Sequence, residues 1–106
     1  MFFMVTAYDG NDGEAYDRRM KVREQHLEGV KKLHTEGKHI FGAAIHDDRD
    51  HMIGSVLIVE YPSKEILIEE WLNHEPYVIG NVWQKINITP CKVPDFFLQT
   101  PYKPRT

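Results

Sequence analysis

The chain has 106 residues, enough for one domain with one hydrophobic core. Charged residues make up 27% and hydrophobic residues 42%, a composition typical of a folded domain rather than a disordered chain. The formal net charge is −3 and the basic residues are dispersed, which argues against a nucleic-acid partner. No apolar run approaches the roughly 18 residues of a membrane span, so we expect a protein that does not enter the membrane. Cys91 has no second cysteine to pair with, so we expect a cytoplasmic protein.

The first two predicted elements are a strand over residues 2–8 and a helix over residues 16–34, separated by a turn rich in Gly and Asp. Wound at about 100° per residue, the helix has one apolar arc that also contains Arg19, Arg23 and His26. Charged or titratable groups in a core are costly unless they are paired. We therefore expect this helix to store polar groups beneath a sheet or to line a cavity. The apolar members of the arc are Tyr16, Met20, Val22, Leu27, Val30 and Leu33.

Two further strands are predicted over residues 39–46 and 52–61, joined by a polar turn. Ser63 is placed to cap a second helix, which we expect to continue until Pro76 stops it. The side of this helix that we expect to be buried consists of Ile66, Leu67, Trp71 and Leu72.

The last predicted strand covers residues 86–93, after a short loop or helical turn over residues 77–82. Pro90 lacks a backbone donor, which indicates a sheet edge or a strand end. We expect one domain over residues 1–106, with a core over about residues 1–93 and an irregular tail over residues 94–106.

The predicted order β-α-β-β-α-β is the ferredoxin-like arrangement, an α+β fold with a four-stranded antiparallel sheet and both helices on one face. The other face of such a sheet is normally polar. Here, however, both alternating sets of side chains in the strand over residues 52–61 are largely apolar. We therefore expect a homodimer whose sheets meet face to face and close a dimeric α/β barrel. The alternative is a tail that folds back over the sheet.

Several short motifs, in their order along the chain, resemble those of the YciI-like (YCII-related) family of small dimeric α/β-barrel proteins. In the first helix, the sequence VREQHL over residues 22–27 places an Arg three positions before a His-Leu pair. The sequence EPYV over residues 75–78 resembles the family's acidic-Pro-Tyr motif. The similarity covers roughly residues 1–93. The other matching features are Glu36-Gly37, Gly42, Ile53-Gly54-Ser55, Gly80-Asn81-Val82 and Thr89-Pro90.

The resemblance implies a pocket centred on a histidine and an acidic residue, in a family that includes a dehydrochlorinase of a chlorinated hydroxyhydroquinone. The wider superfamily includes muconolactone isomerases, so the implied chemistry is that of an isomerase or lyase that needs no cofactor. Two positions depart from the family pattern. Glu75 stands where the family usually has Asp, and Ala43 follows Gly42 where the family often has Gly-Pro. The extra methylene of Glu75 changes where its carboxylate can lie.

His26 is the leading candidate for acid–base chemistry, because an imidazole can take or give a proton near neutral pH. The alternative is a core histidine that only satisfies a backbone carbonyl. A catalytic histidine needs an orienting acceptor, usually a carboxylate. Glu75 is favoured for this role because it matches the family's acidic residue, while Asp47 and, less strongly, Asp9 compete with it.

Arg23 lies three positions before His26, so both side chains can face one pocket. A guanidinium there could bind a carboxylate or a phenolate of a substrate through paired hydrogen bonds. The alternative is a salt bridge to Glu75 or Asp47. That alternative is favoured for Arg19, one turn earlier, and the two interpretations are balanced for Arg23.

Tyr8 and Tyr77 are candidates for the aromatic walls of a binding pocket, and the hydroxyl of Tyr8 could also bond a substrate oxygen. Aromatic side chains, however, more often belong to a core or a dimer interface. We expect no metal site, because the His and Asp residues between His46 and His51 match no compact ligand spacing. Cys91 is expected to be a packed side chain rather than a nucleophile.

Two hypotheses of function follow. In the first, a homodimeric enzyme with one pocket per subunit binds a small-molecule ligand and uses His26 for isomerisation or elimination. In the second, the same pocket belongs to a metabolite-binding or accessory module without catalytic activity.

Overall fold

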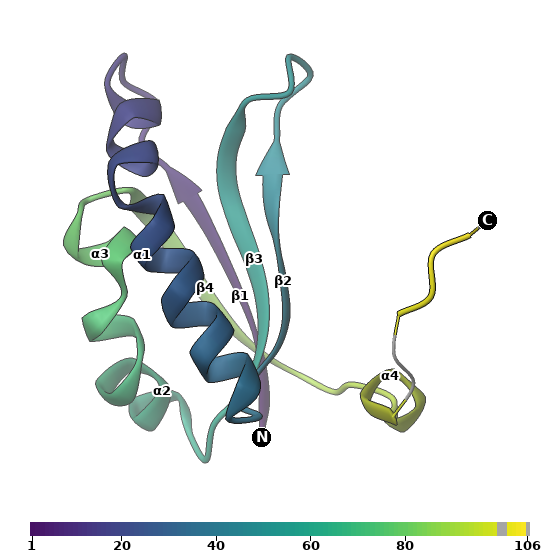
Figure 1. Cartoon of the computed structure of the whole chain (residues 1–106). Helices are drawn as coiled ribbons and strands as arrows, with labels where there is room; N and C mark the ends of the chain where they lie inside the picture. Colours follow the sequence, from purple (N-terminus) through teal and green to yellow (C-terminus); the bar gives the residue numbers. More distant parts are fainter. Residues whose placement is uncertain (100–101, 106) are drawn as a thin grey trace.

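The computed structural model describes residues 1–99 and 102–105 of the chain. Its elements are β1 (Phe2–Asp9), α1 (Ala15–Thr35), β2 (His39–His46), β3 (Met52–Glu60), α2 (Lys64–Glu70), the 3-10 helix η1 (Leu72–His74), α3 (Pro76–Ile79), β4 (Trp83–Cys91) and α4 (Asp95–Gln99). The strands form one antiparallel sheet in the order β2-β3-β1-β4, and α1, α2 and α3 lie on one side of it (Figure 1). The predicted ferredoxin-like fold is therefore confirmed.

The second predicted helix is shorter than expected. Ser63 caps it as predicted, since its Oγ accepts a hydrogen bond from the Ile66 amide at 3.2 Å, but α2 ends at Glu70. The chain then continues as η1, and Pro76 begins α3 instead of ending α2. Proline is favoured in the first turn of a helix, where its missing N–H would have no partner. This break brings Glu75 to the start of α3, facing α1.

The last strand and the tail also differ from the prediction. β4 begins at Trp83, three residues earlier than expected, because the chain pairs with Asp9 past an irregularity in the register. It is an edge strand, as Pro90 indicated. The tail, expected to be irregular, contains the short helix α4, whose Phe97 amide donates to the Pro94 carbonyl at 3.0 Å. Residues 100, 101 and 106 of the tail lie outside the described residues.

The core lies between the sheet and the helices, and alternation along β1 determines which side chains enter it. Phe3, Val5 and Ala7 are at most 1% exposed on the helix side, whereas Met4 and Tyr8 are 38% and 41% exposed on the opposite side. We call that opposite side the bare face. None of the helices in the described residues combines the length and apolar character needed to cross a membrane. The remaining buried apolar side chains are Ala15, Leu57, Val59, Tyr61, Leu67, Trp71, Leu72, Tyr77, Val82 and Trp83.

Helix α1 turns a different set of residues inward than its apolar pattern predicts. Tyr16, Met20 and Leu27 are each more than 40% exposed, whereas Arg19 and His26 are buried. The reason is that α1 packs mainly against β2 and α3, which cover only the middle of the predicted arc. The side chains at the edges of the arc stay open to solvent, and the polar side chains at its centre are enclosed.

A second buried histidine, His39, lies at the start of β2 and is 1% exposed. Its Nε2 lies 3.3 Å from the Tyr61 hydroxyl, its ring packs edge-on against Trp71 at 4.6 Å, and its buried Nδ1 has no partner among the described residues. Burial lowers the pKa of His39 from 6.5 to about 4. The folded chain therefore holds this imidazole neutral.

The burial of His39 predicts that the fold loses stability at acidic pH. The unfolded chain protonates His39 near pH 6.5 and the folded chain only near pH 4, so stability falls as the pH drops through that window. The pKa difference corresponds to about 3 kcal/mol. Urea unfolding between pH 7 and pH 4 should show this loss of stability. In His39→Gln, the free energy of unfolding should change less steeply with pH. The exposed control His51→Gln should keep the wild-type slope; an equal slope in His39→Gln would contradict the assignment.

Candidate functional site

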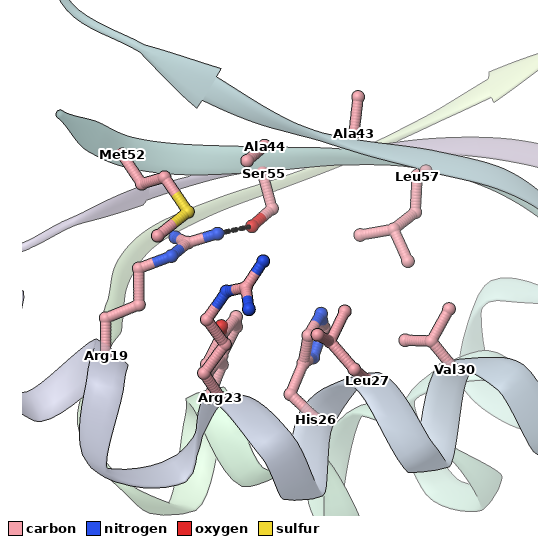
Figure 2. A pocket seen from close by; sticks show the side chains of 12 residues that line it. Arg19, Arg23, His26, Leu27, Val30, Ala43, Ala44, Met52, Ser55 and Leu57 are labelled. Carbon is pink, nitrogen blue, oxygen red and sulfur yellow. Dashed lines mark hydrogen bonds between the residues drawn. The ribbon is translucent and has the colours of Figure 1, made fainter. Parts of the chain in front are cut away.

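A pocket of about 170 Å³ lies between α1 and the strands β2 and β3. Helix α1 contributes the side chains of Arg19, Arg23 and His26 to this pocket, and the sheet contributes those of Ser55 and Leu57 (Figure 2). The helix side is therefore rich in nitrogen donors and the sheet side is largely apolar. Such a cavity suits a small ligand that has one polar edge.

His26 and Glu75 meet at the inner wall of this pocket. His26 Nδ1 lies 2.5 Å from Glu75 Oε1, and the two side chains are 8% and 2% exposed. α1 supplies the histidine, and the break before α3 supplies the carboxylate. Nε2 of His26 forms no hydrogen bond with the described residues. This atom is also not fully buried, so it remains accessible from the pocket.

The position of Glu75 is fixed by two further donors. Trp71 Nε1 donates to Oε2 at 3.0 Å, and the Tyr77 backbone amide donates to Oε1 at 3.2 Å as the N-cap of α3. The three donors together hold the carboxylate of Glu75 in one position. A carboxylate opposite Nδ1 keeps the proton of a neutral imidazole on that nitrogen and leaves the lone pair on Nε2.

The ring of His26 is held by aromatic neighbours. Tyr77 stacks on it with centroids 3.9 Å apart and an interplanar angle of 12°, and Trp83 packs edge-on at 5.7 Å. Burial raises the pKa of the Tyr77 phenol, so its hydroxyl stays protonated. These contacts restrict rotation of the imidazole, so Nε2 keeps one direction relative to the pocket.

Arg19 is engaged in a separate buried network. Its Nη1 donates to both carboxylate oxygens of Asp9 at 3.0 Å, and its Nη2 donates to Ser55 Oγ at 3.0 Å. The same Oγ accepts from Trp83 Nε1 at 3.2 Å, and the guanidinium carbon lies 4.7 Å from the Tyr77 ring centroid. Burial raises the pKa of Asp9 more than the Arg19 hydrogen bond lowers it. Arg19 thus has an ion-pair partner of its own.

Arg23 has no such partner. Its guanidinium forms no ion pair or hydrogen bond with any residue that the structure describes, and it points into the space between α1 and the sheet (Figure 2). An unpaired cation at the mouth of a pocket next to an accessible imidazole nitrogen is suited to hold an anionic oxygen of a ligand.

The structure brings some of the predicted site residues together and separates others. His26, Arg23 and Tyr77 line the pocket, and Glu75 contacts His26. Asp47 instead closes the β2–β3 turn, where its carboxylate accepts the backbone amides of residues 49 and 51 at 2.8 and 2.9 Å.

Two expectations about side-chain partners and positions are wrong. Arg19 forms the expected salt bridge, but with Asp9 rather than with Glu75 or Asp47. Asp9 faces Arg19 because it continues the inward set of β1. Tyr8 has the opposite parity, so its side chain lies on the bare face, away from His26.

Sequence reasoning missed the second layer of the site. Trp71 was expected only as a buried helix residue, and Ser55 only as part of a motif, yet both hold charged side chains in place. The position of Ser55 within the inward set of β3, beside Leu57 and Val59, was a signal of a buried polar contact. Among the residues described, no group of three His, Cys, Asp or Glu side chains could hold a metal ion.

Comparisons with known proteins agree with this fold. The family model described as a YCII-related domain matches residues 1–92. Protein YciI of Escherichia coli is 29% identical over 98 residues, which are 87% of this chain and 97% of the relative. An uncharacterized protein of Haemophilus influenzae is 26% identical with the same coverage. The solved structure of 5-chloro-2-hydroxyhydroquinone dehydrochlorinase (TftG) from Burkholderia phenoliruptrix superposes with a TM-score of 0.74 at 22% identity, covering 91% of this chain and 98% of that one.

Proposed function

Because the chain belongs to the YCII-related domain family, we propose that it is a small-molecule enzyme, an isomerase or lyase that uses His26 as its acid–base group. The observation that carries this proposal is the 2.5 Å contact between His26 Nδ1 and Glu75 Oε1, which leaves Nε2 open to a pocket beside the unpaired Arg23. A positioned base, an orienting carboxylate and an anion-binding group are the parts that proton abstraction requires.

The geometry suggests the following role for each group. Nε2 of His26 takes a proton from a carbon next to a carbonyl group, and Glu75 stabilises the imidazolium that forms. Arg23 binds the oxygen on which negative charge grows. The freed electron pair then either expels a leaving group, which is elimination, or is protonated by the imidazolium at another carbon, which is isomerisation. Both outcomes need only groups that this chain supplies.

A protein of similar fold supports the reaction class. TftG is named as a 5-chloro-2-hydroxyhydroquinone dehydrochlorinase, and its structure is a complex with 2,5-dihydroxybenzoquinone. Loss of HCl from such a molecule is an elimination, and 2,5-dihydroxybenzoquinone is a small planar acid. Both compounds are therefore suitable probes of this pocket, whatever the natural substrate is.

The proposal predicts that binding of a planar anion depends on Arg23. Arg23→Met should weaken the affinity for 2,5-dihydroxybenzoquinone by about 10- to 100-fold, because a hydrogen bond to a charged group contributes about 1.5–3 kcal/mol. Isothermal titration calorimetry measures this change. Lys21→Met removes an exposed cation from the same helix and should bind like the wild type. Equal affinity in both variants would contradict the role of Arg23.

The catalytic part is tested separately with 5-chloro-2-hydroxyhydroquinone and related small phenols and hydroxy acids, by following chloride release or isomer formation. His26→Asn should lower the rate of any turnover by about 100-fold or more, the usual contribution of a general base, while leaving the fold intact. A variant as active as the wild type would overturn the mechanism. Binding that depends on Arg23 without turnover of any compound would favour a metabolite-binding module instead.

We also propose that the protein is a cytoplasmic homodimer formed through the bare faces of two sheets. The exposed apolar side chains Met4 and Phe41 and the half-buried Val56 and Ile58 support this arrangement, since apolar patches of this kind mark interaction surfaces. The single cysteine, Cys91, is consistent with a reducing compartment.

A further inference from the structure

The end of the chain forms an apolar arm that its own domain does not cover. We call residues 93–105 the C-terminal arm, of which the structure describes 93–99 and 102–105. Phe96, Phe97 and Tyr102 are 62%, 63% and 88% exposed, and Leu98 is 41% exposed. A hydrogen bond within the arm joins the Phe97 amide to the Pro94 carbonyl. The match to the family model ends at residue 92, so the arm lies beyond the matched part of the chain.

The arm leaves the sheet next to the most apolar part of the bare face. Cys91, the last residue of β4, pairs with Phe2 at one end of the sheet. Two residues along β1, Met4 pairs with Ile58, and Ile58 pairs with Phe41, which is 58% exposed, so these three side chains form an apolar row across β1, β3 and β2. α4 lies on the side of the sheet away from α1 and apart from the rest of the chain (Figure 1).

The size of the exposed surface fits an interface with a second copy of this chain. A compact monomer of 12.4 kDa should expose about 6,100 Å², whereas this chain exposes 7557 Å². Its radius of gyration is 14.2 Å, against about 13 Å for a compact domain of this length. The excess, about 1,400 Å², is larger than the roughly 800 Å² that each partner contributes to a standard interface. A second copy of this chain supplies a matching surface of the same size.

We infer that the C-terminal arm of one copy packs across the bare face of a second copy, and that the second arm packs reciprocally on the first. This inference rests on the homodimer proposed above. Two-fold symmetry makes the exchange self-complementary, because each copy offers one apolar arm and one apolar row. Phe96 and Phe97 then pack on the row of Phe41, Ile58 and Met4 at one end of the sheet, and the two sheets meet through the rest of the bare face, around Val56.

A photo-crosslinking experiment tests the position of the arm. The photoreactive analogue p-benzoylphenylalanine replaces Phe97 in the full chain, and ¹⁵N-labelled and unlabelled chains are mixed before irradiation. Mass spectrometry should find heavy–light crosslinks to peptides of β2 and β3. The same probe at Ile79, which is 71% exposed on the helix side, should give none of these. Crosslinks within one copy, or none to the bare face, would overturn the inference.

A second measurement separates the arm from the dimer and from the site. Phe96→Ser combined with Phe97→Ser should raise the dimer dissociation constant about tenfold or more in sedimentation experiments, whereas Ile79→Ser should not change it. An unchanged dissociation constant would overturn the role of the arm and leave the sheet-to-sheet dimer standing. A wild-type chain that stays monomeric at every concentration would overturn both, while binding of 2,5-dihydroxybenzoquinone would still test the pocket.

Discussion

Replacing Glu75 with alanine is expected to lower the free energy of unfolding by about 3–5 kcal/mol. The Glu75 carboxylate is buried and accepts from His26 Nδ1, Trp71 Nε1 and the Tyr77 amide. Without it, these buried donors lose their acceptor, and each unmade bond adds a desolvation penalty. Urea unfolding measures the loss. The matched control Glu69→Ala removes an exposed carboxylate nearby and should change stability by no more than about 0.5 kcal/mol.

The amide variant Glu75→Gln separates the structural role of this side chain from its chemical role. Its oxygen can take the place of Oε1 and accept from both His26 Nδ1 and the Tyr77 amide, so most of the stability should remain. Its NH₂ group then faces the Trp71 N–H, and the imidazolium that forms during turnover has no counter-charge. Nitrogen NMR of labelled histidine should show the imidazole proton still on Nδ1, together with loss of turnover. An Ala variant as stable as wild type, or a Gln variant with wild-type turnover, would contradict the assigned roles.

Periodicity in the sequence was sufficient to predict the sheet and to find His26. The predicted strands over 39–46 and 52–61, the second of which ends at Glu60 in the structure, follow from local patterns that the structure confirms, as do the cap at Ser63 and the inward position of His26. The parity of β1 also separates Asp9 from Tyr8, since residues of one parity share a face. The same rule places Tyr8 on the face opposite Phe3, Val5 and Ala7, which is the bare face.

Local sequence patterns could not predict which partners the charged side chains contact. Arg19 is 10 residues from Asp9 and 36 residues from Ser55 in the chain, and His26 is 49 residues from Glu75. These contacts depend on how α1 crosses the sheet and on the break between α2 and α3, which rests on the conformations of a few residues before Pro76. Periodicity gives the face on which a side chain lies, but it does not give which of several acceptors on that face it meets.

The two inward arginines illustrate how this distinction bears on function. Arg19 and Arg23 are one turn apart on α1, and both line the pocket. The charge of Arg19 is neutralised by Asp9 in a site that is 3% exposed, whereas that of Arg23 has no partner among the described residues. We therefore expect Arg19 to contribute to the fold and Arg23 to the ligand, although sequence spacing treats them alike.

Breaking the Arg19–Asp9 pair tests this division. Asp9→Ala should lower the free energy of unfolding by about 3–5 kcal/mol, because it leaves a buried guanidinium without a counter-charge. The double variant Asp9→Ala/Arg19→Met should lose less than this single variant, since no charge then remains buried. Urea unfolding of the four proteins completes a double-mutant cycle. Additive losses in the double variant would show that the pair is not coupled.

The pH dependence of Arg19→Met gives the same pair an independent test. Burial already raises the pKa of Asp9, and removal of Arg19 takes away the group that opposes this effect. A folded-state pKa above the unfolded value stabilises the fold at low pH, and this contribution is lost as the pH rises through the folded-state pKa. Arg19→Met should therefore become less stable relative to wild type as the pH rises from acidic to neutral. The double variant lacks the Asp9 carboxyl, so its stability should lose this dependence on pH. It should still bind 2,5-dihydroxybenzoquinone through Arg23. Loss of that binding would place Arg19 in the ligand site.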